Sequence, residues 1–150
     1  IEWGPIACLP IFSILGISYS LANASSLFDS ATDNDIYTKI NFQFESSCAS
    51  LEVGTGVKSE GDLVISGTKG YVYVPSPWWK TDYFEIRYEN PANNKRYFYQ
   101  LDGEGIRYEI VAFLKSIEDG RDNSYVGRGV SKAIAGVVED FYRKKDVREI

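Results

Sequence analysis

The stretch "GDLVISGTKGYVYVPSPWWK", residues 61 to 80, decides the fold because it holds two short strand patterns joined by a tight turn. Residues 63–66 and 71–74 are rich in β-branched and aromatic side chains, which favour strands. Residues 67–70 between them read Gly-Thr-Lys-Gly, a composition typical of turns. Because so short a link favours neighbouring strands of opposite direction, this stretch predicts an antiparallel hairpin.

Further strand patterns lie on both sides of this hairpin. Upstream, residues 36–44 and 49–53 alternate apolar with polar side chains, as half-buried strands do. Downstream, residues 83–89 and 96–101 are two more strand candidates. The links at residues 45–47 and 90–94 again have turn composition, so the whole run predicts a mainly antiparallel sheet.

Helical patterns flank the strands. Residues 5–15 predict a short helix, with Pro5 in its first turn and Gly16 at its end. Two apolar stripes at helical spacing predict two more helices near the other end, the first of them capped by Asp102. Their members are Ile106, Ile110, Phe113, Leu114 and Ile117 in the first stripe, and Val130, Ile134, Val137, Val138 and Phe141 in the second.

This order of elements predicts an α+β fold, with an open, mainly antiparallel sheet and helices packed on one face, in a single domain of residues 1–150. Both faces of that sheet carry large side chains. The tyrosines occupy alternate positions along the strands that point to one face, and Val72, Val74 and Phe98 occupy positions that point to the other face. A sheet face that no helix covers needs another surface, so we expect a homo-oligomer. The expected interface residues are Tyr71, Tyr73, Tyr97 and Tyr99.

Composition excludes several classes of function. The net charge of −5 argues against a nucleic-acid partner. The chain has no His, and its two cysteines are too few for a zinc site, so no metal is expected. Cys8 and Cys48 are expected to be buried, reduced thiols of a cytoplasmic protein. The apolar start lacks the basic opening of a signal peptide and is too interrupted to span a membrane, so no membrane partner is expected.

Few residues point to chemistry by themselves. The glycine pairs lack the spacing of a dinucleotide or phosphate loop, so no cofactor-binding residue is assigned in this chain. Trp78 and Trp79 offer flat apolar faces and N–H donors, which suit a sugar ring. They suit the edge of a sheet or a subunit interface equally. Carboxylates are plentiful, but the sequence fixes no separation between any two of them, so no catalytic residue is assigned.

Residues 61–80, together with "GEGIRYEIVAFLKSIEDGR" (103–121) and "GVSKAIAGVVEDFYRKKDVREI" (129–150), resemble a known domain. They are similar to the C-terminal domain of the glucose–fructose oxidoreductase/inositol dehydrogenase/rhizopine catabolism (Gfo/Idh/MocA) family. The resemblance implies an intact parent with an N-terminal Rossmann domain that binds NAD or NADP and is absent from this chain. It also implies hydride transfer to or from a sugar, cyclitol or similar polyol. The domain seen here would supply part of the substrate pocket and an oligomer interface.

The same resemblance implies roles for residues 2–6, "EWGPI". Glu2 and Gly4 stand where family members carry Asp and Gly, so Glu2 is a candidate substrate-binding residue beside Trp78 and Trp79. Glu2 is also a plausible helix-capping acid. Ile6 stands where the family has a proton-donating His or Tyr, and isoleucine transfers no proton. We therefore expect this chain alone to be inactive. A sugar-binding or assembly module without catalysis, or a free-standing carbohydrate-binding domain, are the alternatives.

Overall fold

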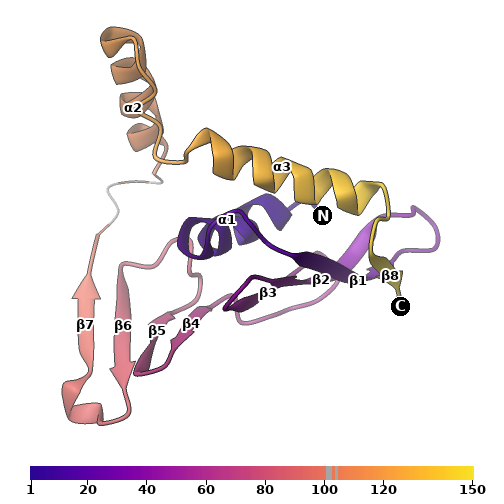
Figure 1. Cartoon of the computed structure of the whole chain (residues 1–150), viewed down its shortest axis with the longest axis horizontal. Helices are drawn as coiled ribbons and strands as arrows, with labels where there is room; N and C mark the ends of the chain where they lie inside the picture. The colour runs from indigo at the N-terminus through magenta and orange to yellow at the C-terminus, as the bar shows by residue number, and fades with distance from the viewer. Residues whose placement is uncertain (101–102, 104) are drawn as a thin grey trace. The chain divides into compact units, whose positions relative to one another are not determined.

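The computed structural model describes residues 1–100, 103 and 105–150, and divides the chain into two compact units (Figure 1). Unit 1 contains both ends of the chain, Ile1–Lys58 and Val126–Ile150. Unit 2 is the intervening segment, Ser59–Tyr125. The prediction of a single domain stays a prediction.

Unit 1 is a four-stranded sheet covered by two helices. Its elements are α1 (Gly4–Leu15), β1 (Leu21–Phe28), β2 (Asp35–Gln43), β3 (Cys48–Gly54), α3 (Arg128–Tyr142) and β8 (Val147–Glu149). The strand order is β3-β2-β1-β8, with β8 parallel to β1 and the other pairs antiparallel. Figure 1 shows α1 and α3 on the same side of this sheet. The sheet therefore has one covered face and one open face.

The core of unit 1 lies between this sheet and its two helices. Phe12 of α1 and Phe42 of β2 are almost fully buried, and their rings meet edge to face with centroids 5.5 Å apart. Phe141 of α3 stacks on Phe28 of β1. The other buried apolar side chains of this core are Ile1, Cys8, Ile11, Ala24, Ile40, Phe44, Leu51 and Val137.

Unit 2 is a second four-stranded sheet followed by a helix. Its elements are β4 (Leu63–Gly67), β5 (Gly70–Val74), β6 (Tyr83–Tyr88), a short 3₁₀ helix η1 (Pro91–Asn93), β7 (Lys95–Phe98) and α2 (Ile106–Asp119). The order is β4-β5-β6-β7 and every pair is antiparallel. Among the described residues of this unit, only Ala112 is buried. This sheet therefore has no dry core on either face.

Most of the predicted elements are confirmed. The class is α+β with mainly antiparallel sheets, the hairpin of residues 61–80 is β4–β5, and Gly16 and Gly120 end their helices at positive φ. Two points differ. The strands form two sheets rather than one, because the glycine-rich polar segment at residues 55–62 adopts no strand after β3. Strand β1 was not predicted, because its buried face consists of alanine and serine. The expected cap Asp102 lies outside the described residues.

The second predicted helix, α2, exists but its apolar stripe does not cover a sheet face. Its stripe, Ile106, Ile110, Phe113, Leu114 and Ile117, is more than half exposed at every position. The expectation that helices cover one face therefore holds for α1 and α3 on the first sheet and not for this stripe of α2.

The aromatic contacts of Phe12 predict the most sensitive core position of unit 1. Its ring stacks on Tyr19 and meets Phe42 edge to face. Phe12→Ala should lower the free energy of unfolding by about 3–5 kcal/mol, through lost burial and the cavity left behind. Urea unfolding followed by circular dichroism measures this change. Ile14→Ala, on the exposed side of the same helix, should change the stability by less than about 0.5 kcal/mol. Equal effects of the two substitutions would contradict this placement of the core.

Candidate functional site

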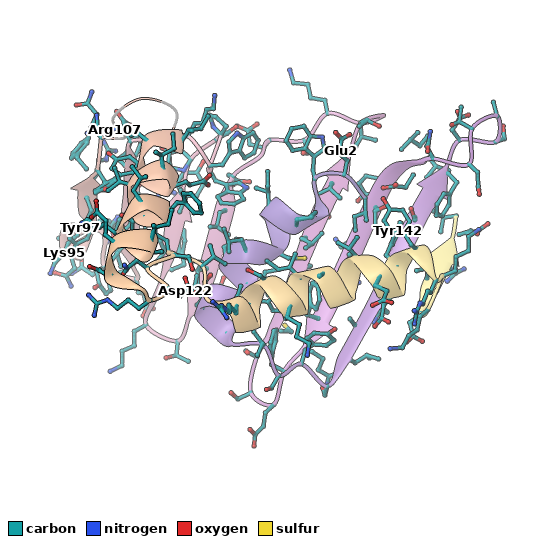
Figure 2. The ribbon with its side chains drawn as sticks, turned by 90° about the horizontal axis from the view of Figure 1, so that it is seen from above. Glu2, Lys95, Tyr97, Arg107, Asp122 and Tyr142 are labelled. Carbon is teal, nitrogen blue, oxygen red and sulfur yellow. The ribbon has the colours of Figure 1, made fainter. Side chains whose placement is uncertain are left out.

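The start of α1 presents Glu2 at an exposed helix N-terminus. Trp3 is the N-cap residue, Pro5 lies in the first turn, and the Glu2 side chain is exposed (Figure 2). Gly4 is buried, and a Cβ there would lie 2.6 Å from the Ile1 side chain, so glycine allows the close packing at this helix start. A carboxylate beside the free N–H groups of a helix N-terminus is electrostatically favoured. A substrate-binding role of Glu2 stays a prediction.

Helix α1 is apolar on all sides, although only one side faces the core. Cys8, Ile11 and Phe12 are buried against the rest of unit 1. On the outer side of the helix, Ile6 and Ile14 are exposed, and Ile6 is 44% exposed. Trp3 at the N-cap and Ile17 just beyond Gly16 are exposed apolar residues at the two ends of the helix. A helix that is hydrophobic all round is normally buried all round. The outer side of α1 is therefore a surface that fits a further apolar surface.

Trp78 and Trp79 are brought together in unit 2 between β5 and β6. Their rings are perpendicular, with centroids 5.9 Å apart. The backbone N–H of Trp78 donates to the Gly61 carbonyl over 3.0 Å, and the Trp79 ring lies beside Gly61. Trp78 is half-buried, whereas Trp79 is 52% exposed. One indole face, that of Trp79, is thus available for stacking on a ligand, and the structure describes it in a different unit from Glu2.

The predicted interface tyrosines do not share one face of their sheet. Directly paired residues of antiparallel strands point to the same side. Tyr71 pairs with Arg87, and Tyr73 pairs with Glu85, which pairs in turn with Arg96. Tyr97 pairs instead with Phe84, the neighbour of Glu85 along β6, so it points to the opposite face. Tyr99 follows β7 and donates its backbone N–H to the Asp82 carbonyl. An interface role of these four residues stays a prediction.

The face with Tyr71 and Tyr73 carries a charged cluster that the sequence analysis missed. Arg87 Nε donates to Glu85 Oε2 over 2.6 Å, and Arg96 Nε donates to Glu85 Oε1 over 2.8 Å. Hydrogen bonds from Arg87 and then Arg96 hold the pKa of Glu85 below its usual range. Arg87 also lies 4.4 Å from the centroid of Tyr73, within the range of a cation–π contact.

Arg96 stacks in the same way over Tyr83, 4.8 Å from its centroid, and Phe98 lies beside Tyr83 with 71% of its surface exposed. The charges of this face are therefore paired with one another, and its outer area is aromatic. Alternation of charged and aromatic residues along each strand is the only sequence signal of this cluster, and it does not give the register that aligns the strands.

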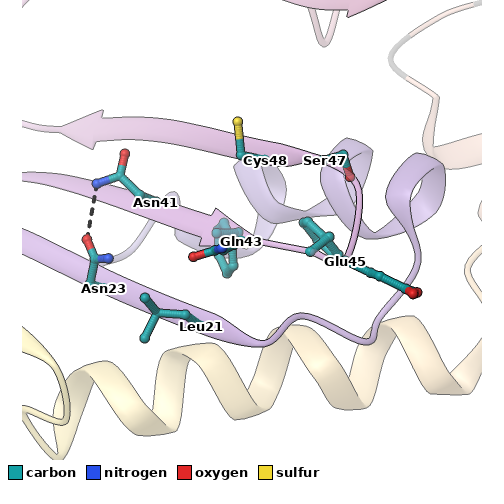
Figure 3. A pocket seen from close by; sticks show the side chains of 9 residues that line it. Leu21, Asn23, Asn41, Gln43, Glu45, Ser47 and Cys48 are labelled. Carbon is teal, nitrogen blue, oxygen red and sulfur yellow. Dashed lines mark hydrogen bonds between the residues drawn. The ribbon is translucent and has the colours of Figure 1, made fainter.

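The open face of the first sheet has a shallow hollow of about 430 Å³ (Figure 3). Amide side chains line it, and Asn41 Nδ2 donates to Asn23 Oδ1 over 3.2 Å. The full lining is Leu21, Asn23, Asn41, Phe42, Gln43, Phe44, Glu45, Ser47 and Cys48. The side chains of Phe42 and Phe44 are buried in the core, so Leu21 is the one large apolar side chain exposed in the hollow. The other exposed groups are mainly polar, so the hollow suits a polar ligand or surface better than an apolar one. The sequence analysis did not single out this set.

No cluster of three or more metal-ligating side chains occurs among the described residues. Within the same residues, no helix is both long and apolar enough to cross a membrane.

Comparison with known proteins gives matches in structure alone. No protein-family model and no curated protein matches the chain. KijD10, a 3-ketoreductase from Actinomadura kijaniata solved with NADP and TDP-benzene, matches with a TM-score of 0.76 at 12% identity. The match covers 98% of this chain and 45% of that one. The aldose-aldose oxidoreductase from Caulobacter crescentus, complexed with glycerol, matches with a TM-score of 0.73 at 16% identity, covering 95% of this chain and 43% of that one.

These structural neighbours are Gfo/Idh/MocA-type oxidoreductases, so the resemblance found in the sequence is confirmed at the level of the fold. The chain spans less than half the length of the neighbours that it matches.

The two cysteines differ in exposure, which corrects the expectation that both are buried. Cys8 is fully buried, and burial raises its pKa to about 12. Cys48 is exposed on the rim of the hollow, because it begins β3 on the outward parity of the strand.

This difference predicts selective alkylation. At pH 8, iodoacetamide should modify Cys48 in the folded chain and leave Cys8 unmodified, because a thiol with a raised pKa holds almost no thiolate at that pH. Mass spectrometry should find one modification in buffer and two in urea. In Cys48→Ser, the folded chain should take up none. Rapid modification of Cys8 in the folded chain would contradict its burial.

Proposed function

We propose that this chain is the substrate-binding and oligomerisation domain of an NAD(P)-dependent oxidoreductase that acts on a sugar, cyclitol or related polyol. The observation that carries the proposal is the fold match, which takes in 98% of this chain and 45% of a 3-ketoreductase solved with NADP. In this proposal the dinucleotide-binding Rossmann domain is a separate part of the parent protein.

The outer side of α1 supports a neighbouring domain at this helix. Trp3, Ile6, Ile14 and Ile17 form an exposed apolar row whose helix is apolar all round. We propose that the Rossmann domain covers this row. Glu2 then lies at the edge of the covered surface, where a carboxylate at a helix N-terminus orients a substrate hydroxyl. Trp79 offers its exposed indole face to a sugar ring.

A second function fits one observation, the residue at position 6. Ile6 is exposed in the first turns of α1, at the place where the family resemblance expects a proton donor. Isoleucine neither donates nor accepts a proton, so this position contributes no acid–base step. In this second function, the parent protein binds a sugar or assembles with partners and catalyses no reaction. Turnover by the parent distinguishes the two functions.

Substitution of Glu2 tests the first function in the longer polypeptide that includes the Rossmann domain. Glu2→Gln keeps the size of the side chain and removes its charge, so the hydrogen bond to a substrate hydroxyl weakens. We expect kcat/KM for nicotinamide reduction by the preferred sugar or cyclitol to fall roughly 10- to 100-fold. Glu2→Asp, which restores the acid expected at this position, should retain most of the activity. Glu60→Gln, a change of another exposed acid, should leave kcat/KM unchanged.

The remaining outcomes of this experiment also decide between the functions. No turnover of any polyol by a longer polypeptide that binds NADPH would favour the non-catalytic module. Lowered thermal stability of Glu2→Gln with unchanged kinetics would show a capping role only. Calorimetry tests whether dinucleotide binding belongs to another domain. The 150-residue chain should give no saturable heat with NADH or NADPH. Micromolar binding of NADH or NADPH by the chain alone would overturn the proposal that a separate Rossmann domain binds the dinucleotide.

The proposal includes self-association through the sheet of unit 2. None of the described residues of β4 to β7 is buried, so this sheet gains its burial from another surface. We assign the contact to the face with Tyr71 and Tyr73, because its charges are already paired and its outer area is aromatic. Apolar area removed from water contributes roughly 25 cal/mol per Å², which favours aromatic faces at interfaces.

Opposite faces of this sheet provide matched variants. Tyr71→Lys places a charge on the proposed contact face and should shift the chain toward the mass of about 17 kDa expected of a monomer. Tyr97→Lys places the same charge on the other face and should leave the mass of the oligomer unchanged. Light scattering at micromolar concentration measures both. A wild-type chain that is monomeric, or a reversed order of the two variants, contradicts the assignment of this face.

A further inference from the structure

Within the described part of the chain, strand β7 is an edge strand whose outer side pairs with no other strand. In the order β4-β5-β6-β7 it pairs with β6 alone, and Figure 1 shows it at the end of its sheet. All of its residues, Lys95–Phe98, are exposed. Edge strands are commonly protected by proline or by a bulge. This strand contains no proline and pairs with β6 without a register shift, so its edge is open to another strand.

The hydrogen bonds between β7 and β6 decide which backbone groups point outward. Tyr99 donates its backbone N–H to the Asp82 carbonyl over 2.7 Å, so the backbone groups of Tyr99 face β6. Successive residues of a strand alternate in this respect, so Tyr97 also bonds β6. The N–H and C=O groups of Arg96 and Phe98 therefore point away from the sheet. These groups need a partner strand or water.

The side chains along this edge are largely aromatic. Phe98 is 71% exposed and Tyr97 is 42% exposed. Arg96 donates to Glu85 within its own sheet, so it brings no unpaired charge to the edge. Lys95, at the start of the strand (Figure 2), is the other charge of β7. An exposed edge with aromatic side chains and little free charge favours the addition of a strand.

We propose that β7 pairs with β7 of a second copy of this chain, antiparallel, so that the two sheets become one continuous sheet. A hydrogen-bonded pair needs an outward residue from each strand, so Arg96 and Phe98 are the residues that pair. Two symmetric registers bring at least three residues of each strand into line. One is centred on Arg96 and sets two arginines directly opposite each other, which is destabilising. The other is centred on Tyr97 and is the register of this contact.

The register centred on Tyr97 satisfies the outward backbone groups of both strands. Arg96 of each copy pairs with Phe98 of the other, and each of these residues donates its N–H and accepts with its C=O. The same pairing sets the Arg96 guanidinium beside the Phe98 ring of the other copy, a cation–π arrangement. On the opposite face of the sheet, Tyr97 meets its symmetry mate and Lys95 lies opposite Tyr99. No like charges face each other, so the edge is complementary to itself.

The size of this contact predicts its strength. Two short strands with aromatic side chains bury roughly 700 Å² in total, below the range of about 1,200–2,000 Å² typical of specific interfaces. We therefore expect association at protein concentrations on the order of hundreds of micromolar. The contact is absent at the micromolar concentrations at which the sheet face is tested. It depends neither on that face contact nor on the proposed enzymatic function.

Disulfide trapping tests the register. Single cysteines replace Arg96, Tyr97 or Phe98 in a Cys48→Ser, Tyr71→Lys background, which removes the exposed native thiol and the proposed contact through the sheet face. A two-fold axis joins identical positions only at its centre. At roughly 0.5 mM protein, Tyr97→Cys should therefore form a disulfide-linked dimer under mild oxidation, since the Cα atoms of such a pair lie about 4.5 Å apart. Arg96→Cys and Phe98→Cys should not, because their symmetry mates lie two residues further along, beyond the roughly 7 Å that a disulfide spans.

The other outcomes of this trapping experiment contradict the contact. Lys69→Cys, in the exposed turn between β4 and β5, sets the background of random collision. Stronger linking of Arg96→Cys or of Phe98→Cys than of Tyr97→Cys would mean another register. Equal linking of all three would mean parallel strands. If no variant links above the Lys69→Cys level, the edge takes up no second copy.

Proline substitution gives a second readout that depends on the backbone hydrogen bonds. The N–H of Phe98 points away from β6, so Phe98→Pro removes no hydrogen bond of its own sheet. Phe98→Ala loses the same ring and keeps the N–H. In the Tyr71→Lys background, Phe98→Pro should weaken self-association at least tenfold more than Phe98→Ala does, because the bond is lost at both symmetric positions.

Sedimentation equilibrium at protein concentrations up to roughly 1 mM measures this difference. Circular dichroism at micromolar concentration checks that both variants keep the fold of the parent chain. If the two folded variants associate equally, the backbone bonds of the edge do not form and the proposal fails.

Discussion

The constraint on which the rest of the structure depends is the uneven distribution of buried apolar area. Among the described residues, the hydrophobic core cluster lies in unit 1, where two helices cover one face of the sheet β3-β2-β1-β8. The sheet β4-β5-β6-β7 has no buried residue among those described. Because hydrophobic burial is the main favourable term in folding, the second sheet is stabilised mainly by its ladder and cross-strand pairs.

Helices α1 and α2 show the same uneven burial of apolar side chains. Helix α1 places Cys8, Ile11 and Phe12 in the core and keeps an apolar row on its other side. Helix α2 is anchored by Ser116 and leaves its apolar stripe exposed. A chain of this length buries enough area in unit 1 to fold. The apolar surfaces left over are then available for binding.

The sequence was sufficient to predict the elements whose buried side chains are large and apolar. Ile40, Phe42 and Leu51 alternate with polar residues, and the structure buries that parity. Strand β1 could not be found in this way, because its buried positions Ala24 and Ser26 are small or polar. Ser26 is fully buried because its hydroxyl bonds the Tyr37 carbonyl and lies 2.8 Å from the hydroxyl of Thr38. A hydropathy pattern does not contain such tertiary hydrogen bonds.

In the candidate site too, some features follow from neighbouring residues in the sequence, whereas others depend on how the strands are aligned. The pairing of Trp78 with Trp79 follows from adjacency, and Glu2 follows from its place before a helix. The faces of the tyrosines follow from register, which sets Tyr73 beside Glu85 and Tyr97 beside Phe84. Register also brings Arg87 and Arg96 to one carboxylate, that of Glu85. Removing this face from water would cost free energy even though its charges are paired, because the paired ions are desolvated as well. In the proposed self-association, burial of the aromatic rings around Glu85 has to outweigh that cost.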